Sequence, residues 1–563
     1  MGITLRAASS PTMTARPLCQ PPAAASVRAG QPLAPRPALV HRPLLQRSAL
    51  QPACIPTRPG GARLPARATR GMKVSASSTA PVVAAAESAP TEGWKGAKLG
   101  AAAASIAVGL VIRFVVPIPG GLDAQAWSLF SIFVATIVGL VAEPLPTGAW
   151  AMLGVTCAIV TKTLTFNQAF GAFCNEVIWL IVASFFFARG LEKTGLGNRI
   201  AQLFVKTLGK STMGLAYGLG LAEVAISPAM PSTSARMGGI FMPIIKSLAE
   251  AAGSLPGKTA KKMGAFLIVS QMQFSNSPMF LTAAAQNLLC LKLAAEMGIV
   301  VNNAWMTWFI GASVPSALML LLTPLLAFKL MPPELQDTPE APAQAEKALQ
   351  AMGPMSTDEK IMAATMAGAV ALWVGGAAIG VSSVAAALLG LGLLLFTGVL
   401  TWKDCLTNTS AWDTLFWFAI LVGMSGQLNA MGVIGCFADA AGGVLQSMSL
   451  SWPVVFGILH AMFFLIHYAF ASQTAHVGAL FSAFVAMMLA AGVPPVLAVL
   501  TLGYNANLFG VINHYSSGQA AIFCGAGYLE LKEVFRVGAV FALFHAVLWA
   551  TVGMAWFKIV GLY

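Results

Sequence analysis

Apolar segments follow one another along this chain from about residue 95 to its last residue, Tyr563. Of its 563 residues, 57% are hydrophobic and 9% are charged, whereas soluble domains carry about 25% charged residues. Helical segments of ~20 apolar residues can cross the ~30 Å hydrocarbon core of a bilayer. The sequence therefore predicts an all-α polytopic membrane protein with about a dozen spans or half-spans.

The amino-terminal part has a different composition. Residues 1–86 contain ten Arg and one Lys and no Asp or Glu, and the rest of the chain has 22 basic and 20 acidic residues. An Arg-, Ala-, Ser- and Pro-rich leader without acid is typical of an organelle transit peptide, and its many prolines favour a plastid address. We predict a disordered plastid transit peptide over 1–77 and a linker over 78–93. A basic tail that stays on the protein is the alternative.

The arginines of this leader stand singly, without the aromatic interleaving of a nucleic-acid site. The sequence therefore predicts no nucleic-acid partner. For the apolar part of the chain, we expect membrane lipid as the surroundings.

A polar stretch, 329–360, divides the apolar part into a first half, 94–328, and a second half, 361–563. Its Pro-Pro and Pro-Glu-Ala-Pro sequences are typical of a flexible aqueous linker. Each half then repeats one order of features: an acidic-apolar entry at Glu176 or Asp413, a glycine-rich tip, a Ser/Thr stretch and a polar island. This pattern predicts two inverted-topology repeats with re-entrant hairpins and broken helices.

The Ser/Thr stretch of the first half spans 228–236, with the sequence PAMPSTSAR. Its two prolines should break a helix, and a break within a membrane must face protein or a water-filled cavity. Ser232, Thr233 and Ser234 can cap a new half-helix, whose positive end attracts anions. The stretch 469–476 is its counterpart. Two kinks in ordinary packed helices are the alternative.

Two half-helix N-termini facing each other could each take one end of a dicarboxylate. Uncharged side chains in the Ser/Thr stretches and in the polar islands, 275–287 and 505–519, can donate hydrogen bonds to it: Ser232, Thr233, Thr282, Gln473, Thr474, Asn513 and Ser516. The cationic candidates nearby are Arg236, His476 and His514. Because a charge within a membrane is costly, Arg236 could face the anion, pair with Glu223, or snorkel to an interface.

The sequence lacks the motifs of an enzyme or a metal site. It contains no H-E-x-x-H, G-x-S-x-G, P-loop or C-x-x-C pattern, and its histidines lack ligand spacing. We therefore predict a protein that is not an enzyme, with no metal and no cofactor. An anion channel and an embedded enzyme are the alternatives from other classes.

Several longer motifs make the chain resemble a known family: 175–181 (NEVIWLI), 185–190 (FFFARG), 229–233 (AMPST), 280–288 (FLTAAAQNL) and 514–520 (HYSSGQA). They are similar to the plastid 2-oxoglutarate/malate translocators of the divalent anion:sodium symporter family, and the resemblance covers about 95–563. It implies a homodimeric secondary transporter of the elevator type. It also implies substrate motifs at Pro231–Ser232–Thr233 and Ser472–Gln473–Thr474, completed near Thr282 and near His514, Tyr515 and Ser516.

In the sodium-coupled members of this family, both substrate motifs read Ser-Asn-Thr and help to hold sodium ions. Pro231 and Ser232 replace the first Ser and Asn, and Gln473 replaces the second Asn. The resemblance therefore implies a sodium-independent exchanger of 2-oxoglutarate against malate in the plastid inner envelope, with succinate, fumarate and glutamate as further candidate substrates. A glutamate/malate exchanger and a sodium- or proton-coupled di- or tricarboxylate or sulfate symporter are the alternatives.

Overall fold

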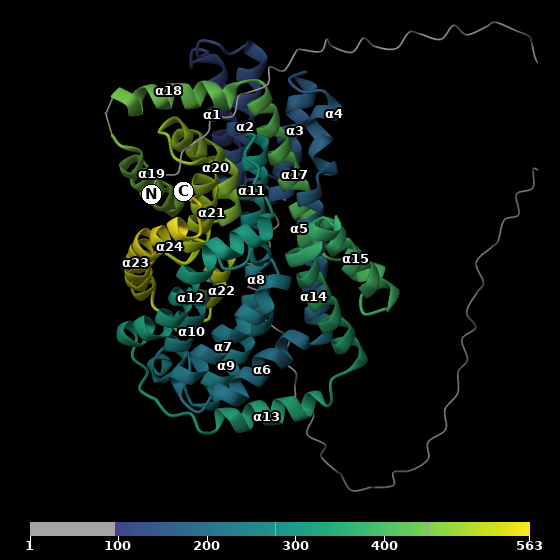
Figure 1. The fold of residues 1–563 in the computed structure, drawn as a ribbon, viewed down its shortest axis with the longest axis vertical. Coiled ribbons are helices and arrows are strands. Elements are labelled where there is room, and N and C mark those ends of the chain that lie inside the picture. Colours follow the sequence, from purple (N-terminus) through teal and green to yellow (C-terminus); the bar gives the residue numbers. More distant parts are fainter. Residues whose placement is uncertain (1–95, 276, 448–449) are drawn as a thin grey trace, which may run out of the picture. The chain divides into compact units, whose positions relative to one another are not determined.

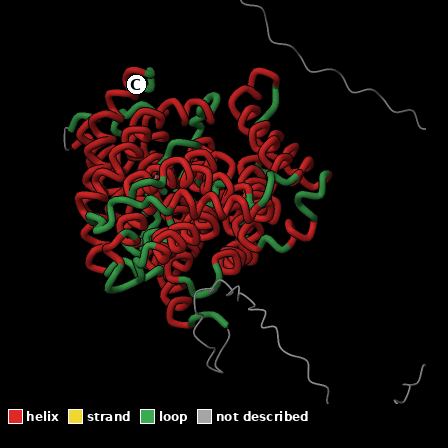
Figure 2. Tube along the Cα trace, turned by 90° about the horizontal axis from the view of Figure 1, so that it is seen from below, coloured by secondary structure: helices red, strands yellow, loops and turns green. Residues whose placement is uncertain are grey.

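The computed structural model describes residues 96–275, 277–447 and 450–563, coloured by sequence in Figure 1. The predicted transit peptide, 1–77, and the linker, 78–93, lie outside the described residues. In the described part, helices are joined by short loops and no strand is present (Figure 2), although Ser211 and Asp337 form one β-bridge. The predicted all-α class is confirmed.

The first half contains the helices α1 (Leu99–Phe114), α2 (Ala124–Ala142), α3 (Thr147–Val160), α4 (Phe166–Phe170), α5 (Glu176–Thr194), α6 (Leu196–Leu208), α7 (Thr212–Ile226), α8 (Thr233–Arg236), α9 (Met242–Ala251), α10 (Gly264–Phe274), α11 (Ala285–Glu296) and α12 (Ala304–Leu330). A π-helical turn, Met237–Phe241, joins α8 to α9, so that one helical run extends through all three.

The linker and second half contain α13 (Ala341–Met352), α14 (Thr357–Gly375), α15 (Ser383–Phe396), α16 (Trp402–Leu406), α17 (Thr409–Ala430), α18 (Val433–Ser447), α19 (Trp452–Ile466), α20 (Gln473–Ala490), α21 (Pro495–Leu508), α22 (Gly518–Gly525), α23 (Leu531–Leu548) and α24 (Met554–Ile559).

Five described helical segments are long and apolar enough to cross a membrane: Ala124–Ala142, Ala304–Leu330, Trp452–Ala469, Gln473–Ala490 and Leu531–Ile559. A sixth is added if the pair Phe166–Cys174 and Glu176–Thr194, bent by 51°, counts as one span. Four other apolar helices in the described part are shorter than a bilayer is thick: Leu99–Phe114, Thr147–Val160, Gly264–Phe274 and Ser383–Phe396. Helices of both lengths agree with the predicted mixture of spans and half-spans.

The two halves repeat the same order of elements. Helix α5 turns into α6 at Gly195 (φ 76°), and α17 turns into α18 next to Gly432 (φ 79°). Glycine adopts this left-handed conformation without steric cost, which explains the glycine-rich tips seen in the sequence. In each half a broken span follows the hairpin, α7/α8 or α19/α20, and then a second interrupted pair, α10/α11 or α21/α22.

The prediction of a flexible linker over 329–360 is wrong, because helix α13 forms within it and packs along α6 (Figure 1). Buried Ala341 and Ala345 lie on one face of α13. The Oγ1 of Thr338 donates to the carbonyl of Gly209 at 2.7 Å, and the guanidinium of Arg199 donates to both carboxylate oxygens of Glu359 at 2.6 and 3.1 Å. These contacts fix the linker to the first half.

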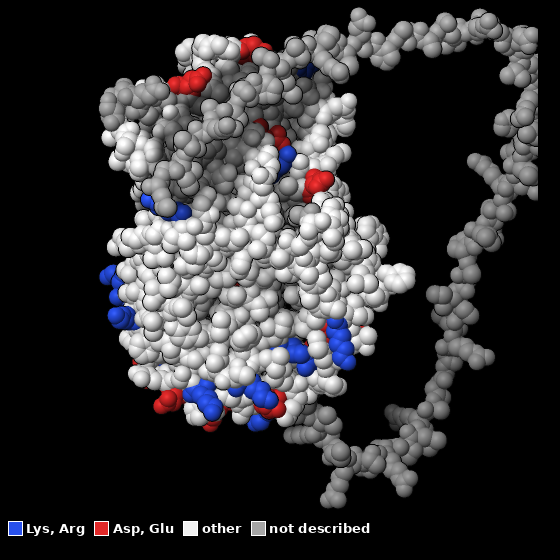
Figure 3. Space-filling view, in the orientation of Figure 1, with Lys and Arg blue, Asp and Glu red and all other residues white. Residues whose placement is uncertain are grey.

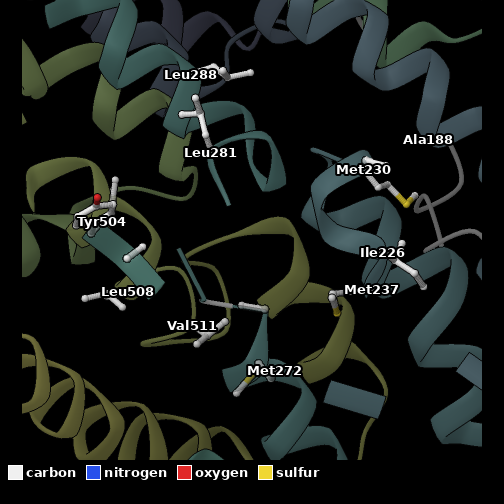
Figure 4. Close-up of a cluster of buried hydrophobic side chains, with 14 of the residues drawn as sticks. Ala188, Ile226, Met230, Met237, Met272, Leu281, Leu288, Tyr504, Leu508 and Val511 are labelled. Atoms are coloured by element: carbon white, nitrogen blue, oxygen red, sulfur yellow. The ribbon is translucent and has the colours of Figure 1, made fainter. Parts of the chain in front are cut away.

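The core joins side chains from both halves. Figure 4 shows Ile226, Met230 and Met237 in the same cluster as Tyr504 and Leu508. Because lipid is as apolar as these side chains, tight packing and hydrogen bonds hold such helices together. The rings of Trp308 and Tyr504 meet edge to face at 4.7 Å, and the Tyr504 hydroxyl donates to the Trp308 carbonyl at 3.0 Å.

Charged side chains are unevenly distributed on the described surface. On the face shown in Figure 3, many gather at the end of the molecule where α13 lies, and a wide band above that end carries few of them. An uncharged band of this kind is the surface that a bilayer core requires.

Candidate functional site

The first broken span interrupts the helix where the sequence predicts it. Helix α7 ends at Ile226, a short 3-10 turn covers Ser227–Ala229, and α8 begins at Thr233. The hydroxyl oxygen of Ser232 is the N-cap and accepts from the backbone N–H of Ala235 at 3.3 Å. The predicted break and its serine cap are confirmed.

The second broken span has the same construction. Helix α19 is followed by a 3-10 turn over His467–Ala469, and α20 begins at Gln473. The hydroxyl oxygen of Ser472 caps it by accepting from the backbone N–H of Ala475 at 3.3 Å.

One cleft, with a volume of ≈ 160 Å³, lies where four helices begin. It is lined by residues at the N-termini of α8, α11, α20 and α22, together with Phe185: Pro231, Ser232, Thr233, Ser234, Ala285, Gln286, Ala471, Ser472, Gln473, Thr474, Ser517, Gly518 and Gln519. None of these residues carries a charge. Free backbone N–H groups at a helix N-terminus bind anions, so four of them give the cleft a positive potential without a cationic side chain.

The halves interleave around this cleft, since α8 packs against α22 and α11 packs against α20. Gly518 makes the first contact possible: a Cβ atom there would lie 2.2 Å from the Ser234 hydroxyl oxygen. Hydroxyl groups from both halves can therefore donate to the same bound anion.

Arg236 lies away from the cleft and is buried. Its Nη2 atom is 3.6 Å from Glu223 Oε1, and its Nη1 donates to the carbonyl oxygens of Ala283, at 2.7 Å, and Met230. The Oε2 of Glu223 also accepts from Gln271 Nε2 at 2.6 Å. Of the three positions open to Arg236, the structure has the pair with Glu223. The guanidinium also donates to one carbonyl of this break, that of Met230, and to one in the turn before α11, that of Ala283.

Five other predicted site residues also lie outside the residues that line the cleft. One is Asn513, whose Oδ1 accepts from the backbone N–H of Tyr515 at 2.9 Å. Thr282 donates to the carbonyl of Pro228 at 2.6 Å, and the Tyr515 hydroxyl donates to the carbonyl of Tyr468 at 3.0 Å. The Ser516 hydroxyl lies 2.9 Å from the carbonyl of Gly510, and the His514 ring lies near the rings of Tyr515 and Phe535. These contacts hold the loops behind the cleft.

Two buried histidines support the second break. His467 Nε2 lies 2.8 Å from the Ser516 carbonyl oxygen, and His467 Nδ1 lies 3.0 Å from His476 Nδ1. The carbonyl requires a proton on His467 Nε2, so His467 Nδ1 accepts from His476 Nδ1–H when both rings are neutral. His476, a cationic candidate in the sequence, serves here as a neutral donor behind the cleft.

The structure brings six predicted residues together in the cleft: Ser232, Thr233, Ser234, Ser472, Gln473 and Thr474. It adds Gln286, Ser517 and Gln519, which the sequence places in the polar islands but which we did not predict as ligands. Ser517 caps α22 by accepting from the N–H of Ala520 at 3.2 Å. A cap residue ahead of an apolar run was the available signal. In the described residues, no group of three or more potential metal ligands is present.

Comparison with known proteins identifies the family. The model of the sodium:sulfate symporter transmembrane region matches residues 97–563. The chain is 58% identical over 471 residues to dicarboxylate transporter 2, chloroplastic, of Spinacia oleracea, covering 83% of this chain and 84% of that one. It is 46% identical over 500 residues to dicarboxylate transporter 1, chloroplastic, of Arabidopsis thaliana, covering 87% and 89%. Together with the apolar helices, these chloroplastic relatives identify a plastid membrane protein.

A solved structure shares the fold at low identity. The MtrF structure of Neisseria gonorrhoeae matches with a TM-score of 0.50 and 12% identity, over 80% of this chain and 97% of that one. The relatives are transporters and not enzymes, as the sequence predicts. By the match over residues 97–563 and the identity to these relatives, the chain belongs to the sodium:sulfate symporter family.

Proposed function

We propose that this protein is a secondary transporter that exchanges dicarboxylates across the plastid inner envelope, independently of sodium. The observation that carries the proposal is the uncharged cleft at four helix N-termini. Such a cleft can stabilise two carboxylates at once through backbone N–H groups and hydroxyls. Two relatives named dicarboxylate transporters support it.

The substrate contacts are assigned to Ser232, Thr233 and Ser234 on one side and to Ser472, Gln473 and Thr474 on the other. Arg236, Thr282, His514, Tyr515 and Ser516 act behind them by fixing the interrupted backbone. A homodimer whose transport domain moves as an elevator follows from the family resemblance and belongs to the same proposal.

Malate exchanged against 2-oxoglutarate is the first candidate reaction. Glutamate differs from 2-oxoglutarate by an ammonium group, which needs an acceptor, and no carboxylate is present among the described residues that line the cleft. Glutamate is the second candidate, because the amide oxygens of Gln286 and Gln519 are neutral acceptors in that cleft.

The test is uptake of labelled malate into proteoliposomes that hold residues 78–563. The vesicles are preloaded in turn with malate, 2-oxoglutarate, glutamate or buffer, and the medium contains no sodium. We expect uptake only into vesicles preloaded with a dicarboxylate. Uptake into empty vesicles that requires sodium would replace the exchanger with a symporter, and uptake down any anion gradient without trans-stimulation would indicate a channel.

A further inference from the structure

The two longest candidate spans meet at one corner of the molecule. Helix α12 ends at Leu330, and the run Leu531–Ile559 begins with α23. The guanidinium of Arg536, in the second turn of α23, donates from Nη2 to the Leu330 carbonyl at 3.3 Å. The end of one span and the start of the other therefore lie side by side. Ends of spans lie where the hydrocarbon of a bilayer gives way to the lipid headgroups.

A loop before α10 packs against both of these span ends. The carbonyl of Lys261 accepts from the backbone N–H of Glu334, just beyond α12, at 3.1 Å. The carbonyl of Ser254 accepts from the hydroxyl of Tyr528, just before α23, at 3.1 Å. We call these three contacting segments the basic corner and define it as residues 253–262, 329–335 and 526–536.

The basic corner contains an excess of positive charge. Its charged residues are six basic ones, Lys258, Lys261, Lys262, Lys329, Lys532 and Arg536, and three acidic ones, Glu334, Glu530 and Glu533. Elsewhere in 87–563 there are 16 basic and 17 acidic residues, so the positive excess of that part of the chain comes from this corner. Within the described residues, Lys261 is the one cation of the six that forms an ion pair, with 3.8 Å between its Nζ and Glu533 Oε1.

An exposed apolar stripe leads away from the corner on each span. On α12 it consists of Leu321 and Leu325, and on α23 of Phe535, Leu543 and Val547. Residues four apart lie on the same face of a helix, so Lys329 lies on the α12 stripe one turn beyond Leu325. An apolar surface that ends in cations is complementary to a lipid whose acyl chains lie beneath an anionic headgroup.

We propose that the basic corner binds an anionic lipid, with its headgroup at Lys258, Lys329 and Lys532 and its acyl chains along the exposed stripes of α12 and α23. The headgroup bridges three segments that are far apart in the sequence. A zwitterionic headgroup suits the corner less well, because it carries an ammonium group that these cations repel. The inference concerns the lipid-facing surface and does not depend on which anion the cleft transports.

The experiment measures how phosphatidylglycerol with a fluorescent acyl chain binds to the purified full-length chain in a neutral detergent. Unlabelled phosphatidylglycerol, phosphatidylcholine and glycerol 3-phosphate compete with it in turn. Phosphatidylglycerol should compete about tenfold more strongly than phosphatidylcholine or better, because each cation near an anionic lipid adds about fivefold in affinity. Glycerol 3-phosphate has an anionic phosphate but no acyl chains, and it should not compete at the same concentration.

The triple variant Lys258→Gln/Lys329→Gln/Lys532→Gln tests the position of the site. These three lysines are exposed and form no ion pair within the described residues, so the variant should keep its fold. It should bind phosphatidylglycerol about hundredfold more weakly than the wild type. If it fails to fold, the single variant Lys532→Gln replaces it and should bind about fivefold more weakly.

The matched control is Lys98→Gln/Lys162→Gln/Lys403→Gln. It removes the same charge from three exposed lysines that lie outside the basic corner, and it should bind phosphatidylglycerol like the wild type.

Equal competition by phosphatidylglycerol and phosphatidylcholine would overturn the inference. Equal binding by the two triple variants would remove the site from this corner. Displacement by glycerol 3-phosphate as strong as that by phosphatidylglycerol would replace the lipid with a soluble anion. Since none of these measurements uses transport, their failure is distinguishable from a failure of the proposed function.

Discussion

Different side chains stabilise the two broken spans, a charged arginine at the first and neutral histidines at the second. The interruptions of each half leave buried backbone carbonyls without a helical partner, and a buried carbonyl without a donor is costly. At the first break the charged Arg236 donates to two carbonyls and is balanced by Glu223. At the second, neutral His467 lies at the Ser516 carbonyl and is paired with His476. A repeat of the backbone therefore does not imply a repeat of the side chains that stabilise it.

The largest expected effect on stability comes from removing the ion pair between Arg236 and Glu223 at the first break. Arg236→Met leaves the buried Glu223 carboxylate unpaired, which should cost about 3–5 kcal/mol of stability. Thermal unfolding of the purified protein measures it. The double variant Arg236→Met/Glu223→Gln carries no unpaired charge and should recover most of the loss. A single variant as stable as the wild type would show that the ion pair does not hold the break.

The next effect concerns the substrate and tests whether the two halves contribute alike. Thr233→Val and Thr474→Val each remove a hydroxyl from opposite sides of the cleft. Each should reduce malate uptake roughly ten- to hundredfold, because a hydrogen bond to a charged group is lost.

Thr323→Val is the control for these variants, since Thr323 is buried in α12 and its hydroxyl donates to the Met319 carbonyl at 2.7 Å. It should transport like the wild type. Normal uptake by both cleft variants would remove Thr233 and Thr474 from the site.

Removing the neutral His467 at the second break should cost less stability than removing Arg236 at the first. His467→Leu leaves the Ser516 carbonyl without its donor, and we expect a loss of about 1–3 kcal/mol in thermal unfolding. His545→Leu is the control, because neither ring nitrogen of this buried histidine has a partner in the described residues. It should be neutral or stabilising. If His467→Leu loses as much stability as Arg236→Met, the charged and the neutral donor contribute equally at their two breaks.

The smallest effect tests the linker, which contacts the first half. The Arg199 guanidinium donates to Glu359 and, with the cap at Ser356, lowers the pKa of this carboxyl although burial opposes the shift. A lowered pKa gives stability that is present above the ordinary value of about 4.3 and is lost as the pH falls through the lowered one. Arg199→Met should therefore cost about 1 kcal/mol at pH 7 and less at pH 4. An equal cost at both pH values would contradict this ion pair.

The sequence predicted features that depend on nearby residues. The prolines and serines of 228–236 specify both the break and its cap, and glycines specify the hairpin tips, because these preferences act within one helical turn. The partners of Arg236 could not be chosen from the sequence, since Glu223 precedes the break and Ala283 belongs to another element. The Gln286 amide donates to Asn507 and the Gln519 amide donates to Gln473, and only the fold brings these pairs together.

The sequence did not predict helix α13 in the linker, 329–360, because its packing also depends on a distant element. Its prolines and charges are typical of a flexible chain, yet Ala341 and Ala345 lie on one face of α13 and pack against the first half. Small residues show little hydrophobic signal, so this packing face was not visible before the fold was known.

The docked linker also has a consequence for assembly. A chain that enters its membrane amino-terminus first completes α6 and α13 before any part of the second half arrives, and early segments of a chain can fold first. Once α13 lies along α6, the chain reaches Thr357 from a fixed starting point. The flexible chain between the two repeats is then shorter, so less entropy is lost when the second half joins the first.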